Sequence, residues 1–224
     1  MGGLAVTAEE YVPGGAPLEP GPDSPQLFAE ALATLVRLAP APATVGALDP
    51  PPPWVGWGHV QSGTWPFPDD LDVDLNKHPG PAWLDEVAER ARHRLQAHAL
   101  PLVIGHADWE SQNMRWSDRR LRVVHDWDSV VSMPEAAIAG VAAAIFPTSD
   151  VQAASSTEEA EAFLRAYEHT RSRLWSAIEW KVCWAAGLWI RAYNAKKEIF
   201  KGTSPTLLGA LAREADHLLS LAGV

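Results

Sequence analysis

The sequence is short of cysteine, of basic residues and of long apolar runs, and each shortage excludes a class of protein. Cys183 is the single cysteine, so no internal disulfide can form, which favours a reducing cytoplasm. With no histidine pair at ligand spacing, a zinc site is not expected. The longest apolar run, residues 182–190, is far below the roughly 20 residues that span a bilayer. No segment resembles a signal peptide. We therefore expect a cytoplasmic protein without membrane contact.

The charge balance is acidic and narrows the choice of partner. The chain has 18 Lys and Arg against 28 Asp and Glu, which gives a net charge of −10. Nucleic acid is not expected as a partner, because its phosphates require a basic face. The acidic balance suits a cationic small molecule, although an acidic surface also serves solubility alone. With 224 residues and 47% hydrophobic content, the chain can bury a sizeable core.

Residues 102–131 concentrate the side chains that could carry chemistry. Residues 102–104 predict a short buried strand. Residues 114–124 predict a β-hairpin with a polar turn at 117–120. The loop before the hairpin and the end of its second arm should therefore lie side by side. Five polar side chains are expected to converge there: His106, Asp108, Asn113, Asp126 and Asp128.

This set of side chains is suited to phosphoryl transfer from a nucleotide. Such a reaction needs a carboxylate to accept or orient the proton of the attacking hydroxyl, and oxygen ligands to hold Mg²⁺ against the phosphates. An aspartate followed five positions later by an asparagine can place the base and one metal ligand on the two sides of one loop. A second aspartate on the neighbouring hairpin completes the metal site.

The pattern H-A-D-x-x-x-x-N followed by H-D-W-D resembles the aminoglycoside phosphotransferase family, the small-molecule branch of the protein-kinase-like superfamily. The resemblance implies ATP and Mg²⁺ as cofactors. It also implies that Asp108 is the catalytic base and that His106 braces the loop. The implied Mg²⁺ ligands are Asn113 and Asp126, with Asp128 a further candidate in the outer shell.

Two positions depart from the family pattern. Ala107 stands where the family usually has glycine, which is tolerable only if the backbone there does not need a positive φ. His125 stands where an apolar strand residue is usual, so its ring should face the site or the core.

The resemblance implies a mainly α (α+β) fold, namely the C-terminal lobe of the protein-kinase-like fold with a small β-hairpin carrying the site. Residues 1–15 would form a hinge-like N-terminal segment, with a brief strand at 4–12, and residues 16–224 the helical lobe. The small N-terminal lobe, which normally covers the nucleotide and supplies the phosphate-pairing lysine, is expected to be missing from this chain.

Periodicity predicts the helices of that lobe. One starts at Ser24-Pro25, with serine as the N-cap, and another opens at Ser204-Pro205. The others are expected at residues 81–99, 136–145, after a capping box at 156–159, and at about 173–200. Residues 43–81 form a Pro/Trp-rich loop, expected to pack over a cleft because its tryptophans are costly to leave in water. Its acids, Asp69, Asp70, Asp72 and Asp74, are interpreted as a solvated segment, with an amine-facing patch as the alternative.

Three functional readings follow. The first is an ATP-dependent phosphotransferase acting on a hydroxyl of a small molecule. The second is a catalytically inactive kinase-like remnant, acting as a binding module or needing a second copy or a partner that bears the N-terminal lobe; an exposed apolar surface would favour it. The third is a metal-dependent phosphoesterase with a two-metal site. Its ligands would be His106, Asp108, His125, Asp126 and Asp128.

Overall fold

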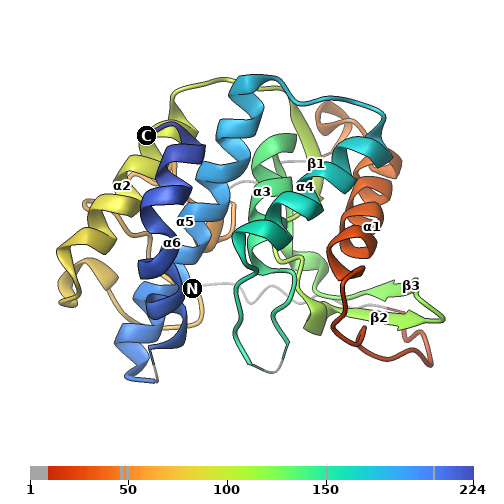
Figure 1. Cartoon of the computed structure of the whole chain (residues 1–224), viewed down its shortest axis with the longest axis horizontal. Helices are drawn as coiled ribbons and strands as arrows, with labels where there is room; N and C mark the ends of the chain where they lie inside the picture. The colour runs from red at the N-terminus through yellow and green to blue at the C-terminus, as the bar shows by residue number, and fades with distance from the viewer. Residues whose placement is uncertain (1–9, 46–47, 49–50, 150, 204) are drawn as a thin grey trace, which may run out of the picture.

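Helices build most of the structure, and the longest of them lies at the centre. The computed structural model describes residues 10–45, 48, 51–149, 151–203 and 205–224. Figure 1 shows α5 between α3 on one side and α6 with α2 on the other, with α4 and α1 beyond α3. The helices are α1 (Ser24–Leu38), α2 (Ala82–Gln96), α3 (Glu135–Ile145), α4 (Thr157–Arg171), α5 (Ala177–Lys201) and α6 (Thr206–Ala222).

Two small antiparallel sheets hold the 102–134 segment. The predicted hairpin is β2 (Met114–Ser117) with β3 (Arg120–Val124), and the predicted strand is β1 (Leu102–His106). The hairpin turn is confined to residues 118 and 119, which both have positive φ, as a two-residue turn of the primed type requires. A fourth strand, β4 (Val130–Pro134), pairs with β1 and was not predicted from the sequence. This strand is short and ends in a proline, so its pattern alone was weak.

The N-terminal part of the described chain runs beside the hairpin. Ala16 and Trp116 form a bridge of two backbone hydrogen bonds, at 2.9 and 2.7 Å. The segment around Ala16 therefore lies next to β2 as a third extended segment beside the hairpin. The strand expected at 4–12 lies outside the described residues as far as residue 9, and residues 10–12 have no regular secondary structure. The division of the chain into a hinge-like segment and a helical lobe stays a prediction.

The helix backbones approach each other most closely where α3 packs against α5. Every residue of α3 is buried, because alanine and glycine let its backbone approach neighbouring helices on all sides. A Cβ built on Gly140 would lie 2.0 Å from the carbonyl oxygen of Cys183. The middle of α5 is also buried all round, as its apolar composition predicted. These two closely packed helices form the part of the core against which the loops pack.

Several helix ends differ from their predicted positions. The capping box of Ser156 and Glu159 is confirmed at α4. A second capping box, made by Ser176 and Glu179, begins α5 later than the predicted residue 173, because it satisfies the first free backbone N–H groups there. Ser24 was wrongly predicted as an N-cap: it lies inside α1, and its hydroxyl accepts a hydrogen bond from the Gly21 N–H.

Two further expectations concern the C-terminal helix and the membrane. The last helix begins at Thr206, directly after Pro205, while Ser204 lies outside the described residues. No helix in the described part of the chain is both long and apolar enough to cross a bilayer.

Candidate active site

The loop between β1 and β2, residues 107–113, is anchored at three points. Trp109 is fully buried, and its indole N–H donates to the carbonyl of Phe28 in α1 at 3.0 Å. The backbone N–H groups of Ser111 and Gln112 donate to carbonyls just after α3, at 3.0 and 3.1 Å. The Pro/Trp-rich loop packs on it from the other side, since the Trp54 indole N–H donates to the Ala107 carbonyl at 3.2 Å. The loop is thus held between α1, α3 and the 43–81 segment.

His106 joins this loop to the end of the hairpin. Its side chain is buried, its Nδ1 accepts from the Asp108 backbone N–H at 3.2 Å, and its Nε2 lies 3.1 Å from the His125 carbonyl. Because Nδ1 is an acceptor, the proton resides on Nε2, which donates to that carbonyl. Burial lowers the pKa of His106, so the ring is neutral. Both ring nitrogens are used within the protein, which leaves neither for a metal.

Asp108 and Asn113 contact each other directly. The Asn113 amide Nδ2 donates to the Asp108 carbonyl oxygen at 3.0 Å and to its carboxylate Oδ2 at 2.7 Å. Burial raises the pKa of Asp108, while the hydrogen bond from Asn113 opposes that rise. Since Nδ2 faces Asp108, the amide Oδ1 of Asn113 is the atom left to meet a ligand.

Asp126 lies where the end of β3 meets this loop. Its backbone is left-handed, with φ 67° and ψ 46°, a conformation that aspartate tolerates better than most residues. The Ser129 hydroxyl donates to Asp126 Oδ2 at 2.9 Å. The Asp126 carboxyl is within hydrogen-bonding reach of the carboxyls of both Asp108 and Asp128, and this contact raises the pKa of Asp128. The structure therefore brings the five residues singled out in the sequence to one place.

This donor set fits Mg²⁺ held jointly with phosphate. Carboxyls that approach so closely repel one another unless a proton or a cation lies among them. Mg²⁺ commonly takes one or two carboxylates from the protein and completes its octahedron with phosphate oxygens and water. Asn113 and Asp126 meet that requirement. Over the described residues, no three His, Cys, Asp or Glu side chains are grouped to hold a metal by themselves. Both ring nitrogens of His106 form hydrogen bonds within the protein, so His106 cannot serve as one of the metal ligands of the phosphoesterase hypothesis.

The two departures from the family pattern are both accommodated. Ala107 is not among the described residues with positive φ, so the alanine is tolerated there. Its backbone N–H donates to the Ser129 carbonyl at 2.9 Å. His125 is half-buried, and its backbone N–H donates to the Asn113 carbonyl at 2.8 Å, which extends the hairpin toward the site.

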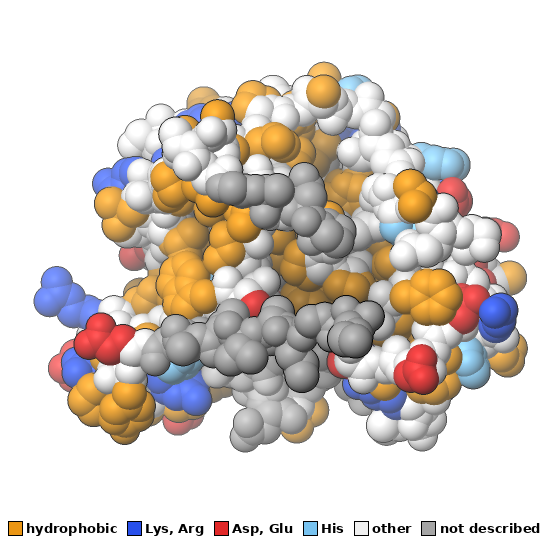
Figure 2. Space-filling model, turned by 180° about the vertical axis from the view of Figure 1, so that it is seen from behind, with side chains coloured by type: hydrophobic (Ala, Val, Ile, Leu, Met, Phe, Trp, Pro, Cys, Tyr) orange, Lys and Arg blue, Asp and Glu red, His pale blue; other side chains and the backbone are white. Residues whose placement is uncertain are grey.

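Two cavities meet at the site. One, of about 550 Å³, opens on the side of Asp126 and Asp128 and is bounded by the prolines at 51–53. The other, of about 220 Å³, lies between Asp108 and α5. Trp54 and Asp69 line both, so they form the wall between them. Figure 2 shows a hollow on the face turned away from the viewer in Figure 1, with apolar side chains gathered around it.

The smaller cavity contains residues that the sequence analysis did not single out. Glu110, only 3% exposed, has a pKa raised to about 8 by burial and by the nearby Asp108, and Gln112 donates to it at 2.6 Å. Tyr193, Asn194 and Lys197 enter from α5. Their spacing on one helical face was visible in the sequence, but it equally describes a core helix. Nothing in the sequence distinguished the two.

The acids of the Pro/Trp-rich loop lie mostly at the surface, and two of them also border a cavity. Asp72 is exposed, as a solvated acid should be, and Asp74 caps a short helical turn through the Asn76 N–H. Asp69 and Asp70 are exposed as well, and both also line the smaller cavity. Asp70 pairs with Lys197 at 2.7 Å, so that lysine neutralises one of the two. The exposure of these acids agrees with the solvated interpretation, and Asp69 and Asp70 also lie where an amine in the cavity could meet them.

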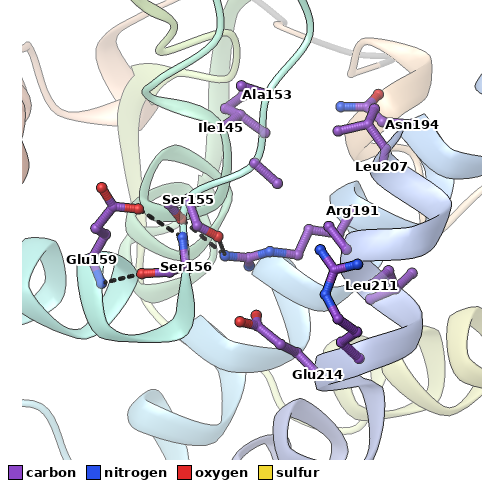
Figure 3. Close-up of a pocket in the computed structure, with 13 residues that line it drawn as sticks. Ile145, Ala153, Ser155, Ser156, Glu159, Arg191, Asn194, Leu207, Leu211 and Glu214 are labelled. Atoms are coloured by element: carbon purple, nitrogen blue, oxygen red, sulfur yellow. Dashed lines mark hydrogen bonds between the residues drawn. The ribbon is translucent and has the colours of Figure 1, made fainter. Parts of the chain in front are cut away.

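A third cavity, of about 270 Å³, adjoins the smaller one and shares Ile145 and Asn194 with it. Figure 3 shows Arg191 reaching from α5 toward Ser155 at the start of α4. Its guanidinium donates to the Ser155 carbonyl at 3.0 Å and to the Ser155 hydroxyl at 2.9 Å. Because these bonds are buried, Arg191 ties the segment before α4 to α5 and fixes one wall of the cavity.

Comparison with known proteins agrees with this geometry. Residues 2–180 match the family model described as "Phosphotransferase enzyme family". The chain belongs to this family. A solved structure with the same fold is that of a choline/ethanolamine kinase family protein from Mesorhizobium loti, with a TM-score of 0.53 and 18% sequence identity. The match covers 88% of this chain and 62% of that protein, so the chain spans less than two thirds of its length. No curated protein matches the chain.

At this identity the likeness shows the fold alone. The fold class inferred from the sequence is confirmed: the chain is mainly α with small two-stranded sheets, and it has a protein-kinase-like fold.

Proposed function

We propose that this phosphotransferase moves the γ-phosphoryl group of ATP to a hydroxyl of a small molecule. The observation that supports it is the meeting of Asp108, Asn113 and Asp126 at the boundary between two cavities. The larger cavity, on the Asp126 side, is open enough for the phosphates of a nucleotide. The smaller, on the Asp108 side, is suited to the acceptor. An in-line transfer requires this placement, because donor and acceptor approach from opposite sides.

Each residue then has a defined role. Asp108 accepts the proton of the acceptor hydroxyl, and Asn113 fixes the orientation of its carboxylate through the 2.7 Å hydrogen bond. Asn113 Oδ1 and Asp126 would hold Mg²⁺, with Asp128 in its outer shell. Mg-ATP supplies the phosphoryl group and a cation that neutralises charge on the phosphates. His106 positions the loop, since its ring spans from the Asp108 N–H to the hairpin.

The chemistry of the smaller cavity favours an acceptor that carries an amine. Asp69 and Asp108 line it, and its one lysine is already paired with Asp70. A cation beside these carboxyls is attracted, whereas an anion is repelled. Aminoglycosides and simpler amino alcohols both meet this description. The net charge of −10 and the single cysteine fit such a role in the cytoplasm.

Calorimetric titration of ATP, with and without Mg²⁺, tests the proposal on the wild type and on Asp126→Asn. Asparagine also tolerates the left-handed backbone at this position, so the variant changes the charge of the ligand and not the loop. We expect Mg²⁺-dependent binding that Asp126→Asn loses and that the exposed Asp72→Asn retains.

Absence of Mg²⁺-dependent binding by the wild type at millimolar ATP would contradict the proposal. That outcome would favour the second reading, in which the chain is an inactive module that binds a ligand or pairs with a second copy or with a partner bearing the N-terminal lobe.

A further inference from the structure

Within the described part of the chain, the hydroxyl of Tyr193 lacks the partner that a buried polar group usually has. Its side chain is fully buried, and its hydroxyl has no hydrogen-bond partner among the residues that the structure describes. Leaving a buried hydroxyl without a partner costs about 1–3 kcal/mol, and native proteins rarely do so without a reason. Tyr193 also lines the cavity of about 220 Å³ that contains Asp108. The other buried polar atoms without a partner belong to residues that do not line this cavity: His59, Arg94, Trp116 and Trp175.

Two neighbouring side chains hold the ring of Tyr193 in place. It lies 6.4 Å from the ring of Trp65, and the Lys197 ammonium lies 5.6 Å from its centroid. Lys197 is itself fixed by its ion pair with Asp70. The hydroxyl therefore has a set position on the α5 wall of the cavity. Burial raises the pKa of Tyr193, so the hydroxyl keeps its proton and acts as a donor.

Tyr167 gives a contrast within the same protein. It is equally buried, but its hydroxyl donates to the Glu135 carboxylate at 3.0 Å. That bond belongs to a structural cluster, since Arg171 also donates to Glu135, at 2.7 Å. The fold thus satisfies one buried tyrosine hydroxyl internally and leaves the other without a partner among the described residues, on a residue that lines the cavity beside Asp108.

We propose that Tyr193 is a specificity-determining residue, whose hydroxyl donates a hydrogen bond to an oxygen of the acceptor other than the one that is phosphorylated. The inference rests on the proposed function, because it takes the smaller cavity as the acceptor site. It narrows the acceptor from any amino alcohol to one with at least two oxygens, such as an amino diol or an amino sugar. A site built to bond a second oxygen disfavours analogues that lack it, because its donor is then left unpaired.

The first test uses stability and needs no ligand. Tyr193→Phe removes only the hydroxyl, so its melting temperature should equal or exceed that of the wild type. Tyr167→Phe is the matched control and should melt several degrees lower, because Glu135 loses a donor. A fall for Tyr193→Phe as large as that for Tyr167→Phe would mean that the Tyr193 hydroxyl is bonded within the protein, and would overturn the proposal.

The second test measures the preference of the full chain for a second oxygen by NMR titration. The probes are 2-amino-1,3-propanediol and 2-amino-1-propanol, which differ by one hydroxyl. We expect the wild type to bind the diol about tenfold more tightly, in line with one good hydrogen bond. Tyr193→Phe should lower affinity for the diol about tenfold and leave the mono-ol unchanged.

Equal affinity for the two probes, no diol binding by the wild type, or a preference that survives in Tyr193→Phe would each overturn the role of Tyr193. Mg-ATP binding, measured on the same samples, separates this failure from that of the proposed function. Tyr193→Phe should bind Mg-ATP as the wild type does. If the wild type itself does not bind Mg-ATP, the proposed phosphotransferase function is contradicted.

Discussion

Asn113 holds Asp108 by two hydrogen bonds from a single amide nitrogen, one to the backbone oxygen at 3.0 Å and one to the carboxylate at 2.7 Å. The two residues are five positions apart, and the loop between them makes a full turn to bring them together. One carboxylate oxygen is thereby bonded, and the Asp108 side chain lines the smaller cavity. In the proposed mechanism this arrangement orients the base and leaves the amide oxygen of Asn113 for the metal.

Replacement of Asp108 by alanine tests the role of the base. A positioned general base contributes about 10²- to 10⁴-fold in rate, so we expect Asp108→Ala to slow phosphotransfer by a factor in that range. The fold should remain, since a buried carboxyl with a raised pKa is not a large source of stability. Rates with an accepted substrate and thermal denaturation on the same samples measure both. The exposed Asp72→Ala is the control. Full activity in Asp108→Ala would show that the base is assigned wrongly.

The local pattern allowed the sequence to predict the site better than the sheet around it. Asp108, Asn113 and Asp126 share a fixed spacing on one loop and one hairpin, so their convergence follows from short-range geometry. The pairing of β1 with β4 joins residues about 30 apart, and nothing local in the short segment 130–134 indicates its partner. Register between distant strands depends on packing in three dimensions.

Residues that reach the site from other elements could not be predicted in the same way. Tyr193 comes from a helix that is buried all round, so its periodicity is that of any core helix. Asp69 belongs to an irregular loop whose path depends on where Trp54 and Trp65 pack. Glu110 is one acid among several loop residues in the sequence, and only the folding of the 107–113 segment encloses it. In each case tertiary packing determines whether the residue reaches the site, and a short stretch of sequence does not reveal that packing.

Glu110 should make stability depend on pH. Its pKa is about 8 in the folded protein and near the ordinary 4.5 when unfolded. Between these values the folded state binds one proton more than the unfolded state, so stability falls as the pH rises through this window. Glu110→Gln cannot titrate and keeps an oxygen for the hydrogen bond from Gln112. We expect the variant to gain more than about 1 kcal/mol over the wild type between pH 5 and pH 8.5.

Urea denaturation of both proteins at the two pH values measures this gain. Glu158→Gln, at an exposed position in the first turn of α4, is the control and should show no such change. Parallel stability curves for Glu110→Gln and the wild type would mean that Glu110 is ionised in the folded protein, and that water reaches it.

Gly140 should be the least replaceable small residue of the core. A Cβ at this position would lie 2.0 Å from the Cys183 carbonyl oxygen and 2.7 Å from the Cys183 carbonyl carbon, both of them backbone atoms that cannot rotate away. Gly140→Ala must therefore push α3 and α5 apart, and we expect it to cost about 3 kcal/mol. Gly209→Ala is the matched control. Its nearest neighbour is the flexible Arg213 guanidinium at 3.8 Å, so alanine should gain roughly 0.5–1 kcal/mol there by helix propensity.

Gly140→Ala should also disturb the active site, because the segment after α3 accepts the backbone hydrogen bonds of Ser111 and Gln112. If α3 moves, the loop that carries Asp108 and Asn113 moves with it, and phosphotransfer should fall in the fraction of Gly140→Ala that remains folded. Urea denaturation and a rate measurement well below the melting temperature separate the two effects. Wild-type stability in Gly140→Ala would mean that the two helices do not approach as closely as their backbones show.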